Sequence, residues 1–405
     1  MSTLLVRRIG SLCTCDPQVG PPPGVIEDAA LTARDGVITF AGRETDLNSS
    51  ALPLDTVEVD ASGLAVVPGF IDAHTHIVWL GERSEEYAQR AGGWTYQEIA
   101  AAGGGIRATV RDTARGDVGA LAAAARERAR RMLRHGTTTV EIKSGYGLTK
   151  AAEMRQLDAA LRLRSDPGLP DVVATYLPLH APPEGDREAF IDAVCIQGID
   201  AAAQRARFVD AFCDEGAFTV AECERVLTAA RARGLGIKLH AEQLSHSGGA
   251  MLAARLGAVS ADHLEHAGEA DLRALAAASV VGVVLPGAAL VLGGPPPPGR
   301  QILDAGARLA VATDCNPGTC YSESMPLMVS LAVALAGLTP AEALAAATTG
   351  GAAALGLMDR GSLRAGMRCD AVILASPRWL DVAYHLGGDV VRTVIRDGRV
   401  FAAGT

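Results

Sequence analysis

Short apolar runs recur along the middle of the chain and alternate with longer stretches that have a helical period. We expect these runs to be eight β-strands, at 66–74, 137–143, 171–179, 208–214, 236–241, 259–264, 280–285 and 308–314. Between them lie segments rich in Ala, Leu and Arg. The clearest predicted helix, 118–135, follows Asp117 as an N-cap and ends at Gly136. Continuous apolar strands that alternate with helices are typical of a parallel sheet, and eight such units predict a (β/α)₈ barrel.

Both ends of the chain have a different pattern from the middle. Residues 1–65 contain short alternating runs joined by turns, and residues 356–405 return to β character after two predicted helices at 322–336 and 340–355. The dipeptide Asp397-Gly398 lies between two apolar runs, which is a strong signal for a β-hairpin. The simplest architecture pairs 1–65 with 356–405 in a small composite β-sandwich, beside an α/β barrel of residues 66–355.

Length, composition and charge agree with a large folded enzyme. The chain has 405 residues, of which 49% are hydrophobic, and a barrel of this type takes about 250 residues. Its net charge of −9 argues against a nucleic-acid partner or an anionic membrane surface. The eight cysteines include no CxxC pair, so we expect reduced thiols in a cytoplasmic protein. The first ten residues lack a long apolar segment, and no signal peptide is expected.

One uncharged stretch, residues 274–299, is long enough to span a bilayer. Pro286 and the tract 295–298 interrupt it, and a helix, a buried strand (VVGVVL) and a loop account for it equally well. Because parallel barrels contain such apolar strands, we expect a barrel strand and no membrane partner.

Polar residues that can bind metals or move protons follow several of the predicted strands. His74 and His76 are two positions apart at the end of the first strand, so their imidazoles point the same way. Further candidates at strand ends are His180, His240, His263 and Asp314. Active sites of barrels of this kind lie at the carboxyl ends of the strands and draw residues from several of them. We therefore expect these side chains to form one site.

Three imidazoles and one carboxylate, from His74, His76, His240 and Asp314, suit one divalent metal ion with a water in an open position. Such an ion lowers the pKa of its water and supplies hydroxide at neutral pH. His263 could then hold or deprotonate that water, or protonate a leaving nitrogen. Taken singly, each residue could equally be a hydrogen-bonded histidine or a solvated aspartate. Their occurrence as a set at strand ends favours the metal site.

The segments PGFIDAHTH (68–76), KLHAEQ (238–243), SADHLEH (260–266) and ATDCNPGT (312–319) resemble the amidohydrolase superfamily and, within it, the imidazolonepropionase family. More specific to that family are GERSEEY (81–87) and EIKSGYGL (141–148). The resemblance implies a barrel with a composite β-sandwich and hydrolysis of 4-imidazolone-5-propanoate to N-formimidoyl-L-glutamate in histidine degradation. It also implies one zinc or iron ion per chain and a cytoplasmic homodimer.

The same resemblance assigns roles to individual residues. It implies metal ligands at His74, His76, His240 and Asp314. It implies substrate contacts at Arg83, Tyr146, His180 and Gln243, and contacts to the product at Asn316, Gly318 and Thr319. Tyr96, in the long segment after the first strand, is a weaker second substrate contact.

The residues themselves support parts of this assignment and leave alternatives open. A guanidinium group matches the propanoate carboxylate, but Arg83 could instead be a surface residue paired with Glu85 or Glu86. Tyr146 lies between two glycines, as in a loop pressed against a ligand, although ordinary packing is also compatible with it. The NPGT turn (316–319) could offer backbone N–H groups and a hydroxyl to an anion. Lys143 either adds positive charge near the site or is solvated.

Gln243 bears on the type of reaction. Deaminases that resemble this chain commonly carry Glu three residues after the fifth-strand histidine, as a proton shuttle to the departing amine. Gln243 is a neutral amide that can hold a cyclic amide but cannot shuttle protons. Glu242, its neighbour on a strand, would point to the opposite face. A one-metal deaminase is thus the first alternative function.

A second alternative, a barrel without catalysis, is disfavoured because all four candidate ligands are present. The superfamily's two-metal members carry a lysine at the end of strand four. Here that strand ends CDEGA (213–217), without a lysine, which favours a single ion.

Overall fold

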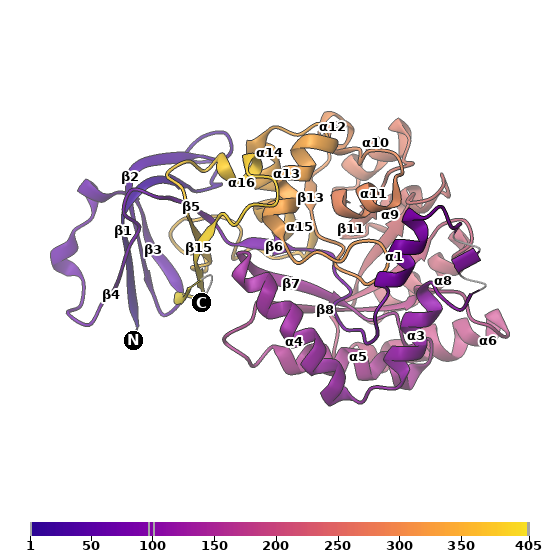
Figure 1. Ribbon diagram of the computed structural model, residues 1–405. Helices are drawn as coiled ribbons and strands as arrows, with labels where there is room; N and C mark the ends of the chain where they lie inside the picture. Colours follow the sequence, from indigo (N-terminus) through magenta and orange to yellow (C-terminus); the bar gives the residue numbers. More distant parts are fainter. Residues whose placement is uncertain (1, 96–97, 100–101, 403–405) are drawn as a thin grey trace.

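The computed structural model describes residues 2–95, 98–99 and 102–402. It contains two eight-stranded sheets, one built from the two chain ends and one from the middle of the chain. Figure 1 shows the sheet of the chain ends on one side and the helix-covered barrel on the other. This arrangement confirms the predicted fold class.

The barrel sheet is parallel, and its strands follow one another in chain order. These strands are β6 (Phe70–Asp72), β7 (Thr137–Lys143), β8 (Asp171–Leu179), β9 (Phe208–Cys213), β10 (Gly236–Ala241), β11 (Ser260–His263), β12 (Val281–Val284) and β13 (Leu309–Val311). The first and last strands meet beyond their carboxyl ends, where the Asp314 N–H donates to the His74 carbonyl at 3.0 Å and the His76 N–H donates to the Cys315 carbonyl at 3.0 Å. The barrel is therefore closed at the end where the site lies.

Helices cover the outside of the barrel (Figure 1). They are α4 (Val118–Arg134), α5 (Lys150–Leu163), α6 (Arg187–Phe190), α7 (Gln197–Ala202), α8 (Val220–Arg231), α9 (Gly249–Leu256), α10 (Glu269–Ala277), α11 (Pro286–Leu292), α12 (Gly299–Asp304), α13 (Met325–Leu335), α14 (Pro340–Ala345) and α15 (Gly351–Ala354), with the π-helical segments η3 (Ile191–Ile196) and η4 (Ala346–Gly350). The predicted helix at 118–135 is confirmed as α4, and Asp117 caps it by accepting the Ala120 N–H at 2.8 Å.

In the described part of the long interval after β6 lie the additional helices α1 (Ser84–Ala91) and α3 (Ile106–Ala114). The stretch 274–299, which could have been a membrane span, contains the end of α10, the buried strand β12 and α11. Within the described residues, no helix has both the length and the apolar character that crossing a membrane requires.

The second sheet joins the two ends of the chain. Its strands are β1 (Thr3–Cys13), β2 (Val25–Arg34), β3 (Val37–Arg43), β4 (Val57–Asp60), β5 (Ala65–Pro68), β14 (Ala371–Leu374), β15 (Val391–Arg396) and β16 (Arg399–Ala402), and the short helices η1 (Glu44–Asp46), η2 (Ser49–Ala51) and α16 (Asp381–Tyr384) lie in its connections. Antiparallel pairing of β5 with β14 links the two halves, and their apolar side chains share one hydrophobic cluster. Asp397 and Gly398 have φ of 53° and 70° and join β15 to β16, so the predicted hairpin is confirmed.

The predicted strand 66–74 is wrong as a single element. Its first half belongs to β5 in the sheet of the chain ends, and its second half contains β6 of the barrel. The chain passes between the sheets at Gly69, where a Cβ atom would lie 2.4 Å from the Thr138 hydroxyl oxygen, so only glycine fits. The division into residues 1–65 with 356–405 and residues 66–355 stays a prediction. If the two sheets mark the two units, the first boundary falls at Gly69.

Candidate active site

Hydrogen bonds join the first and eighth strands of the barrel directly below the site. The buried carboxylate of Asp72 accepts hydrogen bonds from the Thr313 N–H at 3.0 Å and from the Thr313 hydroxyl at 2.6 Å. Burial raises the pKa of Asp72 to about 7. This contact fixes the positions at which His74 and Asp314 leave their strands.

Four predicted ligand atoms converge at the carboxyl end of the barrel. His74 Nε2 lies 3.2 Å from His76 Nε2, which is 3.4 Å from His240 Nε2. Asp314 Oδ1 lies 3.5 Å from the Nε2 atoms of both His74 and His76. Ligands of a tetrahedral zinc ion with bonds of about 2.0–2.1 Å stand roughly 3.3–3.4 Å apart. The spacing fits one ion held by His74, His76 and Asp314, and His240 lies beside His76 and forms a second close group with His74 and His263.

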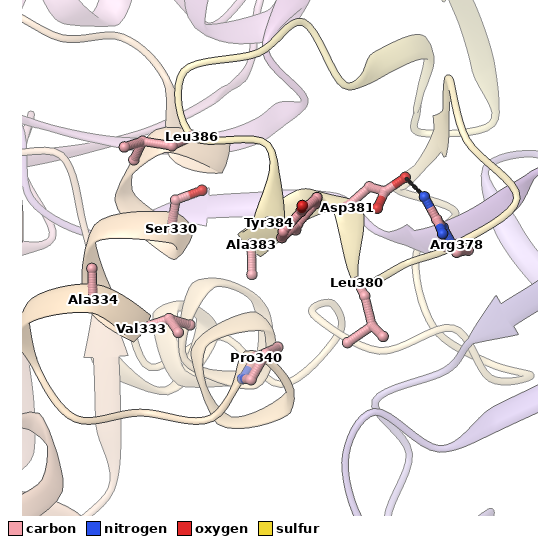
Figure 2. A pocket seen from close by; sticks show the side chains of 10 residues that line it. All are labelled: Ser330, Val333, Ala334, Pro340, Arg378, Leu380, Asp381, Ala383, Tyr384 and Leu386. Carbon is pink, nitrogen blue, oxygen red and sulfur yellow. Dashed lines mark ion pairs between the residues drawn. The ribbon is translucent and has the colours of Figure 1, made fainter.

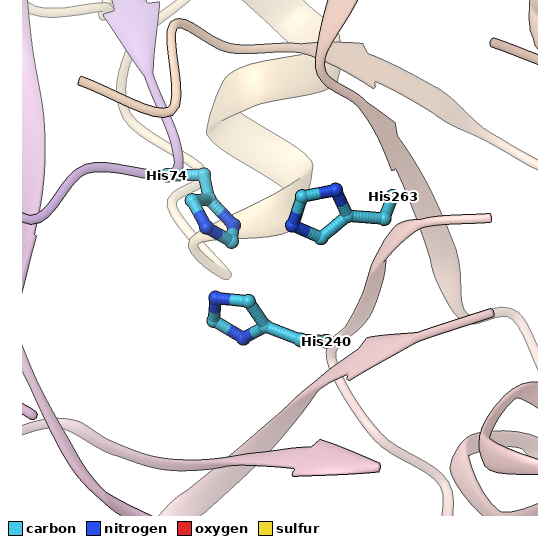
Figure 3. A group of neighbouring side chains, drawn as sticks. All are labelled: His74, His240 and His263. Carbon is cyan, nitrogen blue, oxygen red and sulfur yellow. The ribbon is translucent and has the colours of Figure 1, made fainter. Parts of the chain in front are cut away.

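The ionisation of this cluster also suits a metal. Burial lowers the pKa of the imidazoles of His74, His76 and His240 well below the usual value, which keeps them neutral. Neutral imidazole is the form that binds metals. Burial raises the pKa of Asp314 to about 6, so its carboxyl group is ionised at neutral pH. Figure 3 shows the rings of His74, His240 and His263 turned toward one another from separate segments of the barrel.

A carboxylate behind the cluster orients the imidazole of His74, and a second carboxylate lies close to that of His240 without forming a hydrogen bond. His74 Nδ1 lies 2.6 Å from Asp262 Oδ2, and His240 Nδ1 lies 3.1 Å from Asp210 Oδ2. Both carboxylates are fully buried. Partners of this kind fix the tautomer of a ligating histidine and turn its Nε2 toward the metal.

Two buried lysines complete this layer. Lys143 Nζ lies 2.7 Å from Asp210 and 2.9 Å from Glu141, and Lys238 Nζ lies 2.8 Å from Glu141. Burial alone would lower the pKa of Lys143, but the surrounding carboxylates outweigh it and hold that pKa above its ordinary value. The interpretation of Lys143 as a solvated residue is wrong, because its side chain has no exposed surface.

A cavity of about 530 Å³ opens above the cluster. It brings together eleven of the residues predicted from the sequence: His76, Arg83, Tyr146, His180, His240, Gln243, His263, Asp314, Asn316, Gly318 and Thr319. His74 lies beneath it, fully buried. Tyr96 lies outside the described residues. The apolar wall of the cavity contains Ile106, Phe212 and Leu292, which no sequence motif indicated.

A second hollow of about 610 Å³ lies between α13, α14 and α16 (Figure 2). Its lining is mostly apolar, and its one ion pair joins Arg378 to Asp381 at 3.7 Å. The ten described residues that line it include none of the predicted site residues. The predicted site residues therefore line the cavity above the cluster and not this second hollow.

Arg83 both lines the cavity and forms an ion pair. Its Nε and Nη2 atoms donate to Glu86 Oε2 at 3.0 and 2.8 Å, and its side chain is 13% exposed. The other nitrogen, Nη1, faces Gly318 so closely that a Cβ there would stand 2.5 Å away. The two interpretations of Arg83 are thus compatible, because the pairing with Glu86 leaves Nη1 directed at the NPGT turn.

Tyr146 and His180 form one wall of the cavity. The His180 ring stacks on His76 with centroids 4.9 Å apart, and the Tyr146 ring lies 5.2 Å from that of His180. His180 Nδ1 lies 3.1 Å from the Gly145 carbonyl oxygen, so this nitrogen is the donor and Nε2 is free to accept. Burial lowers the pKa of His180 to about 4, which keeps the ring neutral.

The NPGT turn is arranged differently from expectation. The Gly318 and Thr319 N–H groups both donate to Asn316 Oδ1 at 2.8 Å, so they are not free to bind an anion. The Asn316 side-chain amide donates to the Asp314 carbonyl at 2.7 Å and to the Thr319 hydroxyl at 2.8 Å. Asn316 therefore holds the turn against Asp314 in this structure.

The backbone has an unusual conformation at His263, the last residue of β11. His263 and Leu264 have φ of 83° and 74°, a conformation that is rare for residues other than glycine. Its Nδ1 lies 3.7 Å from the carboxylate of Glu265, whose side chain is 5% exposed. Burial disfavours the charged imidazole, but Glu265 outweighs burial and raises the pKa of His263. A proton acceptor of raised pKa therefore stands beside the cluster.

Glu242 and Gln243 point to different places, but strand alternation is not the reason, because β10 ends at Ala241 and Glu242 has a φ of 54°. Gln243 lines the cavity, whereas Glu242 is fully buried and accepts hydrogen bonds from the Ser247 and Ala250 N–H groups. The residue three positions after His240 is thus a neutral amide at the cavity surface.

Comparisons with known proteins agree with this geometry. Residues 65–401 match the model of the amidohydrolase family. The chain is 46% identical over 393 residues to the imidazolonepropionase of Deinococcus deserti, with 94% of this chain and 96% of that protein covered. It is 45% identical to that of Deinococcus radiodurans, with coverage of 98% and 99%. It is 40% identical to that of Mycolicibacterium smegmatis, with coverage of 99% and 98%.

The chain belongs to the imidazolonepropionase family of amidohydrolases. This membership confirms the family that the sequence motifs indicated, and it makes the protein a hydrolase that acts on a small molecule. The chain also superposes on the N-isopropylammelide isopropylaminohydrolase of Burkholderia multivorans (TM-score 0.71, 19% identity, 99% and 98% coverage) and on a zinc-bound adenosine deaminase of Xanthomonas campestris (TM-score 0.71, 21% identity, 98% and 92% coverage). At these identities the likeness concerns the fold alone.

Proposed function

We propose that the protein hydrolyses 4-imidazolone-5-propanoate to N-formimidoyl-L-glutamate in histidine degradation. The main support for this proposal is that one cavity is lined by neighbouring metal-type donor atoms, an arginine and a neutral amide. An anionic cyclic amide needs a cation for its carboxylate and an uncharged hydrogen-bonding partner for its ring. The names of the full-length relatives support the same substrate.

His74, His76, His240 and Asp314 are the proposed ligands of one divalent ion, and this set of nitrogen and oxygen donors accepts either zinc or iron. Bound there, the ion would lower the pKa of a water molecule and polarise a carbonyl group. The fold would favour metal binding by keeping the three imidazoles neutral and by directing their Nε2 atoms toward one point.

In the proposed reaction, Arg83 binds the propanoate carboxylate through its free Nη1, which orients the ring in the cavity. Gln243 donates to the ring carbonyl and accepts from the ring N–H. His180 Nε2 accepts a second N–H, and Tyr146 packs beside the ring. Asn316, Gly318 and Thr319 remain the proposed product contacts, and the N–H groups of Gly318 and Thr319 would have to leave Asn316 Oδ1 to bind the new carboxylate. Tyr96 remains a predicted second contact.

His263 is the proposed proton carrier. The water oxygen bonds to the carbonyl carbon of the ring, and His263 takes the proton that this water loses. The bond from that carbon to the ring nitrogen then breaks, and His263 returns the proton to the nitrogen. One water is consumed, the ring opens to a new carboxylate, and no ammonia leaves. Asp314 is the other proposed catalytic residue, through its place beside His74 and His76 in the proposed ligand set.

The test is to supply 4-imidazolone-5-propanoate to the purified metal-loaded protein and to follow the loss of its ultraviolet absorbance together with ammonia. We expect the substrate to disappear without ammonia. Ammonia formed in step with substrate loss, or activity only on amino-substituted rings, would contradict the proposal and favour a deaminase.

The resemblance further supports a homodimer located in the cytoplasm. Light scattering of the purified chain checks the assembly, and a mass near one chain would contradict the dimer.

A further inference from the structure

A buried carboxylate lies under the turn that carries Tyr146. Glu153, in the first turn of α5, has no exposed surface. Its Oε1 accepts the N–H groups of Gly147 at 2.8 Å and Leu148 at 2.9 Å, and its Oε2 accepts the Gly145 N–H at 2.9 Å. Three N–H groups of one short turn thus converge on a single side chain.

The remaining N–H group of this turn is held by the same helix. Gln156, one helical turn beyond Glu153, accepts the Tyr146 N–H with its Oε1 atom at 3.2 Å. Four successive backbone N–H groups, from residue 145 to residue 148, therefore donate to two side chains of α5. Carboxylates accept such hydrogen bonds about twice as strongly as neutral groups do, so Glu153 is the stronger of the two anchors.

The turn has no room for a side chain at either of its two glycines. Gly145 has a φ of 120°, and a Cβ atom there would lie 2.6 Å from His180 Nδ1. A Cβ atom on Gly147 would lie 2.5 Å from the Glu153 backbone nitrogen. The backbone is thus pressed between α5 on one side and the imidazole of His180 on the other.

Two groups of the cavity wall depend on this turn. Tyr146 belongs to it, and the Gly145 carbonyl oxygen lies 3.1 Å from His180 Nδ1, which fixes the direction of that ring. Burial raises the pKa of Glu153, and the donors that oppose burial most strongly belong to the turn itself: Ser144, Leu148, Gly147 and Gly145. The carboxylate of Glu153 therefore accepts its backbone hydrogen bonds from this turn.

We propose that Glu153 is a positioning residue of the active site, which holds the turn of residues 144–148 so that Tyr146 and His180 face the substrate. The assignment to substrate binding rests on the proposed function. An acceptor-only group is needed here, because an amide in the same place would turn its NH₂ group toward at least one backbone N–H and lose that bond.

The experiment compares Glu153→Gln with the wild type in the metal-loaded enzyme. Hydrogen exchange of the segment 144–149, measured without substrate, should speed up at least tenfold. KM should rise at least tenfold, with kcat changed less than threefold and metal content unchanged. Glu342→Gln is the matched control: Glu342 also accepts a backbone N–H, that of Thr339 at 2.8 Å, but it caps α14 and does not line the cavity. The control should leave KM and the exchange of 144–149 as in the wild type.

If Glu153→Gln does not fold, Glu153→Asp replaces it, because the shorter carboxylate keeps the charge but cannot reach all three N–H groups. Wild-type exchange and wild-type KM in whichever variant folds would overturn the proposal. So would an equal rise of KM in the control. Because the exchange is measured without substrate, faster exchange in an enzyme that does not open the imidazolone ring would reject the proposed function and keep the anchoring role of Glu153.

Discussion

Replacing Asp262 with Asn should weaken metal binding without removing any ligand. Asp262 Oδ2 lies 2.6 Å from His74 Nδ1, and both side chains are fully buried. Asn offers an amide instead of an anion, so the imidazole loses the partner that fixes its tautomer. Loss of such a partner costs roughly 10–100-fold in metal affinity. At about 1.4 kcal/mol for each factor of ten, this is about 1.4–2.8 kcal/mol.

The assay is a competition titration of the metal-free protein with zinc and a coloured chelator. Asp370→Asn is the control, because Asp370 is also buried and ion-paired, with Arg368 at 3.2 Å, but it belongs to none of the clusters of ligand-type atoms among the described residues. We expect the control to bind zinc roughly 10–100-fold more tightly than Asp262→Asn does. Wild-type zinc affinity in Asp262→Asn would contradict this role of Asp262, as would an equal loss of affinity in both variants.

Three further predictions concern substrate binding, catalysis and stability. Arg83→Met should lower kcat/KM about 10–100-fold, because the substrate carboxylate loses a hydrogen bond to a charged group that is worth roughly 1.5–3 kcal/mol. Steady-state kinetics measure kcat/KM, and an unchanged value would make Arg83 a partner of Glu86 only. His263→Ala should lower kcat by roughly 10²–10⁴ with normal metal content, and loss of metal in elemental analysis would instead make His263 a ligand. Asp171 is about one third exposed, and its pKa is lowered because Arg360 and Arg368 outweigh burial. It therefore stabilises the fold above the unfolded pKa of about 3.9, and this contribution is lost as pH falls through its folded pKa. Asp171→Asn should cost about 1–2 kcal/mol at pH 7 in urea unfolding. A gap from the wild type that does not shrink as the pH is lowered from about 3.9 through the folded pKa of Asp171 would argue against this linkage.

The sequence predicts the barrel well because parallel strands buried on both faces must be continuous apolar runs. It could not predict the break at Gly69. VVPGFI is apolar throughout, so its pattern is the same for one strand as for two. What separates the halves is their partners: β5 pairs with β14, some 300 residues later, and β6 pairs with β7. Partner choice depends on residues far away in the chain, which a local pattern does not contain.

The histidines of the site were predictable because the site lies at strand ends, whereas the buried ion pairs behind it were missed. A signal for them existed. Glu141 with Lys143, and Lys238 with His240, are spaced two apart inside otherwise apolar strands, so each pair points to one face. A charged residue within a buried strand must find an opposite charge. Which charges meet depends on how neighbouring strands are staggered along the barrel axis, and the sequence pattern alone does not give that stagger.

The same ion pairs support the proposal of one metal ion. The described residues contain a second group of ligand-type atoms directly behind the first, from His74, Glu141 and Asp262. Both lysine ammonium groups already lie there, each within 2.9 Å of Glu141. A divalent ion about 4 Å from an ammonium group would be repelled by roughly 8 kcal/mol at an effective dielectric constant of 20, and two such groups are present. The sequence favoured a single ion because no lysine ends the fourth strand. The structure supplies a different reason, which is that Lys143 and Lys238 provide the positive charge that a second ion would bring.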